Sequence, residues 1–293
     1  MKRVVVLGAS GMLGSMLVRQ LAPTMQVRAT VRDIQFIKVI PNVDWWGLNA
    51  AASDVRQQLW KAVADCDVAI NAIGIIPQRF GPALSWKVNV DFPRQLRDVS
   101  HLCPVIQIAT DCVYDGVRGH YTESDIPGGS AEWYGSDKWR GEFRSPWVKY
   151  LRCSIIGPEY HGKSLLGWLL GQAKGATVPG WTNHHWNGVT TLAFAKICRG
   201  VIAEDLRLPW MRHHLVPMDQ VTKYELLCYL AKAFRPDVTI VPTDADGFAV
   251  DRTLATIDYS MNRELWRVGG YERVPTIREL VQELAESEVL CQV

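Results

Sequence analysis

The stretch VVVLGASGMLGSMLVRQLAP, residues 4–23, decides the fold. It has the pattern of a buried strand, a turn that contains Gly8, Gly11 and Gly14, and a helix that ends at Pro23. Glycines permit a tight turn and a close backbone approach, while the N–H groups and the positive dipole at the start of a helix attract a pyrophosphate. Because this loop stands between a strand and a helix, we predict that it binds a dinucleotide.

The first half of the chain alternates short β-branched runs with longer amphipathic segments, which indicates a parallel sheet built from βαβ units. The sequence therefore predicts a Rossmann-type doubly wound α/β domain over residues 1–157 and a smaller C-terminal α/β substrate domain over 158–293, with some later segments returning to the first domain. The expected strands are Val4–Leu7, Gln26–Val31, Asp67–Asn71, Val105–Ala109 and Val148–Arg152, and the expected helices lie near 12–22, 53–64, 84–101, 131–144, 191–203, 222–234 and 276–287.

Composition narrows the classes of partner. The 32 basic and 30 acidic side chains leave a formal net charge of +2, so we expect no nucleic-acid partner. The apolar runs are shorter than the roughly 20 residues that a membrane span needs, which predicts a cytoplasmic protein with no membrane partner. The seven cysteines have no CxxC spacing, so we expect neither disulfides nor a metal site.

The residue type after the second strand bears on the cofactor. An acidic residue there bonds the adenosine ribose of NAD, whereas an arginine accommodates the 2′-phosphate of NADP. Arg32 precedes Asp33 in this chain, so NADP(H) is favoured over NAD(H). Three further places should contact the cofactor: the glycine loop, Asn49 after a third strand-like run, and the end of the next strand. The expected cofactor contacts are therefore Gly8, Ser10, Gly11, Met12, Leu13, Gly14, Arg32, Asn49, Asn71, Ala72 and Ile73.

The run EWYGSDKWRGE, residues 132–142, places Tyr134 and Lys138 four positions apart, on one face of an expected helix. An ammonium group beside a phenol favours the phenolate, which makes Tyr134 a candidate acid and base. Thr110 ends an expected strand, and this fold holds its ligands at the carboxyl ends of strands. Its hydroxyl can hydrogen-bond a substrate carbonyl.

These motifs resemble the extended short-chain dehydrogenase/reductases. ATDCVYDGVRGHYTESDIP followed by YGSDKWRGE is most similar to the dTDP-4-dehydrorhamnose reductase-like nucleotide-sugar reductases, over about residues 1–157. The resemblance implies that Tyr134 is the proton donor, that Lys138 also bonds the nicotinamide ribose, and that Thr110 polarises the carbonyl. It implies reduction of a keto group on a nucleotide-activated sugar, in surface polysaccharide synthesis, by an enzyme that is often a homodimer.

Related 4,6-dehydratases have Asp and Glu after the threonine, so Asp111 followed by Cys112 disfavours a dehydratase activity. Three alternatives to a simple sugar reductase stay open. Enzymes that resemble GDP-fucose synthase use a cysteine at this place with a histidine, which would make Cys112, with His161, part of an epimerase/reductase. A non-catalytic NADP-binding regulatory subunit is the second alternative, because the methionine adenosyltransferase beta subunit resembles the same reductase group. A reductase of a non-sugar carbonyl is the third alternative.

The second half offers fewer motifs. Trp181 can stack on a base, Asn187 can bond a phosphate or sugar, and Arg252 in AVDRTLAT can clamp a diphosphate. We expect these three residues and Thr110 to bind the substrate. Two histidine pairs are interpreted as polar loop residues rather than metal ligands: His184 with His185, and His213 with His214.

Overall fold

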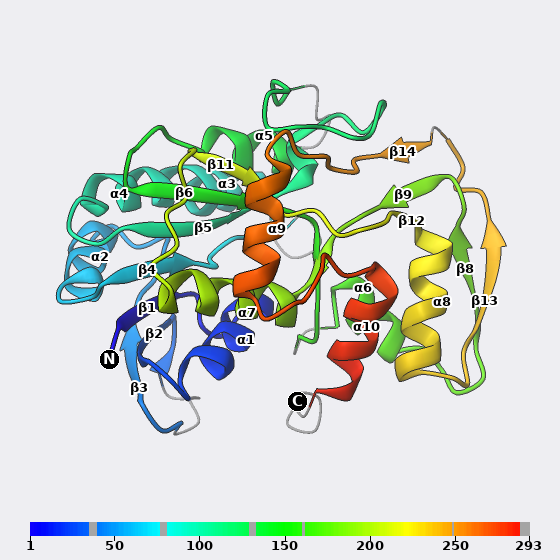
Figure 1. Cartoon of the computed structure of the whole chain (residues 1–293), viewed down its shortest axis with the longest axis horizontal. Helices are drawn as coiled ribbons and strands as arrows, with labels where there is room; N and C mark the ends of the chain where they lie inside the picture. Colours follow the sequence, from blue (N-terminus) through cyan, green and yellow to red (C-terminus); the bar gives the residue numbers. More distant parts are fainter. Residues whose placement is uncertain (35–39, 77–80, 129–132, 160–161, 248, 288–293) are drawn as a thin grey trace.

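The computed structural model describes residues 1–34, 40–76, 81–128, 133–159, 162–247 and 249–287. Its centre is a sheet of parallel strands, shown in Figure 1: β1 (Arg3–Leu7), β2 (Gln26–Val31), β3 (Val43–Gly47), β4 (Val68–Asn71), β5 (Val105–Ala109), β6 (Val148–Arg152) and β11 (Arg212–His214). Their order is β11-β6-β5-β4-β1-β2-β3. The predicted Rossmann-type sheet is confirmed, and its order reverses between β1 and β4, where such folds hold ligands.

Helices cover both faces of this sheet because its strands are buried on both sides. In β1, Val4 and Val6 pack into the core that includes α1 (Met12–Leu21) and α7 (Thr191–Ala203). Val5 and Leu7 point to the opposite core, which includes α2 (Val55–Val63) and α4 (Phe92–Val99). This alternation follows from the two-residue period of a strand.

Most of the predicted helices are present with small changes. The segment predicted at 84–101 consists of α3 (Pro82–Trp86), a π-helical stretch over Lys87–Asp91 and α4. The helix predicted at 131–144 is α5 (Trp133–Arg140), and residues 131–132 lie outside the described ranges. A short 3-10 turn over Asp111–Val113 follows β5.

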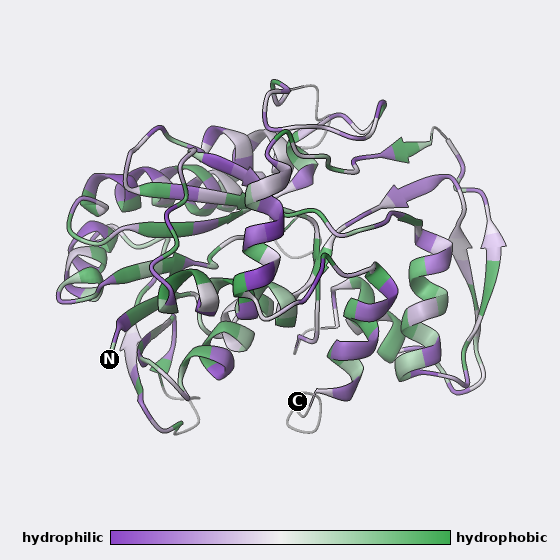
Figure 2. Ribbon diagram, in the orientation of Figure 1, coloured by the Kyte–Doolittle hydropathy of each residue, from purple (hydrophilic) through white to green (hydrophobic). Residues whose placement is uncertain are grey.

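A second group of elements lies beside the sheet, on the right in Figure 1. It contains the strand pairs β7 (Ile155–Ile156) with β10 (Val189–Thr190) and β8 (Thr177–Trp181) with β13 (Thr239–Thr243), the strands β12 (Val221–Thr222), β9 (His184–Trp186) and β14 (Val250–Asp251), and the helices α6 (Leu165–Leu170), α8 (Lys223–Phe234) and α10 (Ile277–Glu286). Figure 2 shows hydrophobic and hydrophilic stripes on α8 and α10. Leu226 and Leu230 of α8 and Leu280 and Leu284 of α10 lie in the core.

Later segments return to the central sheet. Strand β11 pairs with β6, and α7 packs into the same core as α1, although both follow residue 157 in the chain. Helix α9 (Tyr259–Val268) contributes Leu265 and Trp266 to that core. The division of the chain at residue 157 stays a prediction.

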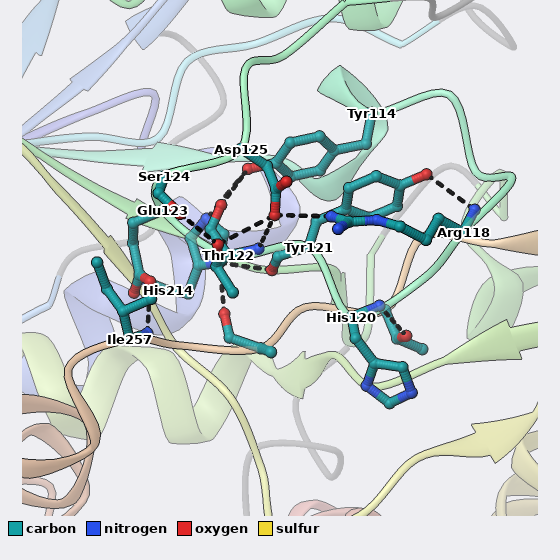
Figure 3. Close-up of polar contacts among 12 residues, drawn as sticks. Tyr114, Arg118, His120, Tyr121, Thr122, Glu123, Ser124, Asp125, His214 and Ile257 are labelled. Carbon is teal, nitrogen blue, oxygen red and sulfur yellow. Dashed lines mark hydrogen bonds and ion pairs between the residues drawn. The ribbon is translucent and has the colours of Figure 1, made fainter.

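Polar contacts hold the loop after β5 against later segments of the chain, as Figure 3 shows. The Glu123 carboxylate accepts hydrogen bonds from the backbone N–H of His214 at 2.9 Å, the Thr256 hydroxyl at 2.7 Å and the Ile257 N–H at 3.0 Å. Tyr114 and Tyr121 stack in the same loop with their ring centroids 4.3 Å apart. The loop is therefore held by β11 and by the segment before α9.

The interpretation of the four histidines as loop residues is wrong. His184 and His185 lie in strand β9, and His213 and His214 lie in strand β11 with only 2% and 1% of their surface exposed. Histidine pairs of this kind carry no apolar alternation, which is why the sequence did not indicate strands there.

His214 is neutral in this setting. Its Nδ1 faces two carbonyl oxygens, that of Ala255 at 2.8 Å and that of Tyr121 at 3.1 Å, so Nδ1 carries the proton. Its Nε2 lies 3.2 Å from the Arg152 guanidinium, which donates to it. Burial, and then the charge of Arg152, lower the pKa of His214 from 6.5 to about 4.

This shift predicts a pH-dependent stability. Because the folded pKa lies below the unfolded value, only the unfolded chain takes up the proton as the pH falls from about 6.5 toward 4, and stability is lost over that window. We expect a loss of about 2 kcal/mol between pH 6.5 and pH 5 from this group. Burial also lowers the pKa of His213, so this residue adds to the same dependence of stability on pH.

His214→Gln should be less stable at pH 7 but should have a flatter dependence between pH 6.5 and pH 5, measured by urea unfolding. The exposed His101 supplies the control, and His101→Gln should keep the wild-type slope. An unchanged slope in His214→Gln would contradict the assignment.

Candidate active site

The glycine loop has the shape that the sequence predicts, and two of its glycines are required by geometry. Gly8 has a φ of +84°, and a Cβ added at Gly14 would lie 2.0 Å from the Gly8 carbonyl oxygen. Helix α1 begins at Met12, and its N-cap residue, Gly11, provides no side-chain hydrogen bond. The first N–H groups of α1 are thus left for a ligand.

A cavity of about 620 Å³ opens in front of this loop. Strands β1, β4 and β5 end around it, so it occupies the carboxyl edge of the sheet at the reversal of strand order. Of the predicted cofactor contacts, its lining includes Ser10, Gly11, Met12, Leu13, Ala72, Ile73 and Lys138. Gly8 and Gly14 shape the loop behind this lining.

Besides Gly8 and Gly14, three predicted cofactor contacts do not line the cavity. Asn71 is buried, donates to Gln107 Oε1 at 3.2 Å and accepts from the Ile73 N–H at 3.0 Å, so its side chain fixes the turn after β4. Asn49 is exposed, and its Oδ1 accepts the N–H of Ala51. Arg32 is exposed directly after β2. Contacts of Asn49 and Arg32 with the adenosine end stay predictions.

The three predicted catalytic side chains line one cavity. Thr110 follows β5, and Tyr134 and Lys138 come from α5. The Thr110 hydroxyl accepts the N–H of Cys112 at 3.2 Å and donates to Asp111 Oδ1 at 3.2 Å. A hydroxyl held in this way can turn its proton from Asp111 toward an oxygen atom in the cavity.

Lys138 is buried, with 8% of its surface exposed, and its Nζ lies 3.5 Å from the Ile108 carbonyl oxygen. Burial lowers the pKa of Lys138, and the charge of Glu142 opposes the shift. Gly74 keeps the space beside the ammonium open, because a Cβ there would lie 3.7 Å from Nζ. The ammonium is therefore fixed between β4, β5 and α5.

A buried ion pair that sequence reasoning missed holds α5 in place. Glu142, just past the end of α5, accepts two hydrogen bonds from Arg152, at 2.8 and 2.7 Å, and one from Arg212 at 2.5 Å. Burial alone would raise the pKa of the Glu142 carboxyl, but the two guanidinium groups hold this pKa below its usual value. Only the long-range pairing of β6 with β11 brings the two arginines together.

Cys112 lines the same cavity as Tyr134. Its thiol lies 3.8 Å from Asp111 Oδ1, and the charges of Lys138 and Lys223 interact with it. His161, the histidine considered with Cys112, lies outside the described residues.

The predicted substrate residues separate into two groups. Trp181 and Arg252 line the cavity, and Trp181 is 45% exposed beside His184, with a ring-centroid distance of 4.6 Å. Asn187 does not line it. Its side chain donates to the Leu254 carbonyl at 2.7 Å and accepts the Leu254 N–H at 2.9 Å, so both polar ends are used in holding two segments together. Its assignment to the substrate is therefore withdrawn.

Two charged residues of the lining were not assigned from the sequence. Asp111 is buried, and burial raises the pKa of its carboxyl, while the charges of Lys223 and Arg252 oppose that shift. Lys223 is the first residue of α8. Its position 112 residues after Asp111 gave no local signal, and only the tertiary fold brings the two near each other.

Across the described residues, no group of three or more metal-ligating side chains is present. In the same part of the chain, no helix is long and apolar enough to cross a membrane.

The contact between Gly14 and Gly8 predicts a specific failure. Gly14→Ala should weaken NADP(H) binding by at least about tenfold and lower the melting temperature, because a methyl group there displaces the loop backbone. Gly47→Ala is the control, since a Cβ at Gly47 meets no atom within 4 Å. Fluorescence titration and thermal melting measure both effects, and a Gly14→Ala variant that binds like the wild type would contradict the account.

Comparisons with known proteins agree with this architecture. A hypothetical dTDP-4-dehydrorhamnose reductase from Sulfolobus tokodaii superposes with a TM-score of 0.72 at 21% identity, over 89% of this chain and 94% of that one. A dTDP-4-dehydrorhamnose reductase from Bacillus anthracis in complex with NADP gives 0.71 at 16% identity, over 97% and 99%. A UDP-glucuronic acid 4-epimerase variant from Bacillus cereus, in complex with UDP-4-deoxy-4-fluoro-glucuronic acid and NAD, gives 0.72 at 15%, over 97% and 98%.

At these identities the structural likeness establishes the fold. No curated protein sequence matches the chain. The family model of the RmlD substrate binding domain, however, matches residues 1–286, so nearly the whole chain is covered. The chain belongs to the RmlD substrate binding domain family.

Proposed function

We propose that the chain reduces a keto group on a nucleotide-activated sugar with a nicotinamide cofactor. The observation that carries the proposal is one continuous cavity. It runs from the glycine loop, past Thr110, Tyr134 and Lys138, to Trp181 and Arg252. Its volume of about 620 Å³ lies in the range of ligand sites.

The chain's own residues have distinct roles in this proposal. The Tyr134 phenol gives its proton to the oxygen that becomes an alkoxide, and the Lys138 ammonium favours the phenolate that remains. The Thr110 hydroxyl donates to the same oxygen and draws electron density from the carbonyl carbon. When bound, the nicotinamide supplies the hydride. Its pyrophosphate fits the start of α1, where the N-cap Gly11 leaves the backbone N–H groups uncovered.

The preference for NADP(H) over NAD(H) is part of the proposal. Arg32 directly follows β2 and is exposed, as an arginine that meets a 2′-phosphate must be. The neighbouring structures include a reductase in complex with NADP and an epimerase in complex with NAD. The family resemblance further supports a nucleotide-diphosphate sugar as substrate, a role in surface polysaccharide synthesis, a cytoplasmic location and a homodimer.

Tyr134→Phe tests the proton transfer. It should lower kcat for NADPH oxidation with 4-keto nucleotide sugars by about 100-fold or more, because the proton donor is lost, and it should keep the affinity for NADPH. Tyr259, which is 69% exposed and outside the cavity lining, provides the control, and Tyr259→Phe should have wild-type activity. If Tyr134→Phe keeps the wild-type kcat, another residue delivers the proton.

Epimerisation together with reduction is a second candidate, favoured by the position of Cys112 between Lys138 and Lys223. A thiolate there can remove a proton from a carbon beside the ketone. In D₂O this activity would place deuterium on that carbon of the product, and Cys112→Ser would abolish the uptake, as mass spectrometry of the product can measure. Reduction without such uptake would leave a simple reductase.

A further inference from the structure

Lys223 is placed where a lysine is costly to the fold. It is the first residue of α8, where the positive end of the helix dipole opposes a cation. The N-terminal N–H groups of α8 are already served by a capping box between Thr222 and Glu225. Lys223 is half-buried, and the partial loss of water around its ammonium lowers its pKa.

The described part of the protein supplies few interactions that compensate for the lost water around this ammonium. Among the residues that the structure describes, no carboxylate forms a salt bridge with Lys223 and no hydrogen-bond acceptor is paired with it. Its Nζ lies over the Trp186 ring, 5.5 Å from the centroid. It lines the cavity beside Asp111, Cys112 and Arg252. A half-buried charge placed against the helix dipole and without an ion pair is typical of a functional site.

Arg252 adds a second cation at the same place. Its Nε donates to the Tyr114 carbonyl at 3.2 Å, which fixes the side chain in the cavity wall. The nearby carboxylate, Asp111, already accepts hydrogen bonds from Thr110 and Cys112. Lys223, which has no ion pair among the described residues, thus stands near a second cation in the same cavity wall, and this setting suits an anionic ligand.

We propose that Lys223 and Arg252 form a two-cation site for an oxyanion of the substrate, and that Lys223 determines which nucleotide sugars are accepted. The oxyanion is either the diphosphate or a carboxylate on the sugar. This inference rests on the proposed function, because it assigns the substrate end of the same cavity. A lysine that only compensates the charge of Asp111 would serve stability instead.

Binding measurements on the full chain separate these roles. Isothermal titration with NADP⁺ present would use thymidine, dTDP, UDP-glucose and UDP-glucuronate as probes. If the oxyanion is the diphosphate, Lys223→Gln should weaken the binding of dTDP and of both UDP-sugars at least about tenfold and leave the binding of thymidine unchanged. If it is a sugar carboxylate, only UDP-glucuronate should weaken by that factor. Either pattern supports the site.

Two further variants complete the experiment. Lys223→Arg should retain most of the affinity, because it keeps a cation at this position. Lys232→Gln removes the same charge from an exposed position of the same helix and should bind like the wild type. Lys223→Gln should also have an unchanged or higher melting temperature, since it removes a half-buried cation from the start of a helix.

Unchanged affinities in Lys223→Gln would overturn the proposal, as would a wild-type chain that binds no diphosphate or carboxylate probe. The proposal would also be overturned if Lys223→Gln lost binding together with a lower melting temperature and Lys223→Arg did not restore the binding. The outcome is independent of catalysis. Binding as described without NADPH oxidation by any keto sugar would refute the reductase activity and leave the anion site in place.

Discussion

The buried ion pair between Glu142 and Arg152 is the interaction on which the site depends. Arg152, at the end of β6, is fully buried, and its second nitrogen donates to the Tyr114 hydroxyl at 2.8 Å and faces His214 Nε2. One guanidinium therefore joins the end of α5, the loop after β5 and strand β11. Two charges of this kind are stable in the interior only when each is paired and hydrogen-bonded. Loss of Glu142 would leave the Arg152 charge uncompensated, and loss of Arg152 would leave Arg212 as the cation on Glu142, beside the helix that holds Tyr134 and Lys138.

This arrangement explains how two groups of elements line one cavity. The glycine loop, Thr110 and α5 are set by the central sheet and by the Glu142–Arg152 pair. Trp181, Lys223 and Arg252 come from the strands and helices beside it. In the proposed function, the first group carries out the chemistry and the second selects the substrate.

The sequence predicted the first group well because its signals are local. Five expected strands agree with the structure to within a residue at each end, since apolar runs and glycine spacing are read within a few positions. Thr110, Tyr134 and Lys138 were identified by their place at a strand end and on one helix face. The second group was poorly predicted because its strands are short and its contacts join distant segments. Lys223 has no motif of its own, and Asn187 looked polar and available until its pairing with Leu254 was visible.

Transfer of a labelled hydride tests the account most directly. Purified chain would be incubated with NADPH deuterated at the transferred position of the nicotinamide and with 4-keto sugars linked to dTDP or UDP, and the sugar product would be examined by mass spectrometry. The account predicts oxidation of NADPH and one deuterium on the carbon that carried the ketone. A chain that binds NADPH but transfers no deuterium to any of these sugars would contradict it.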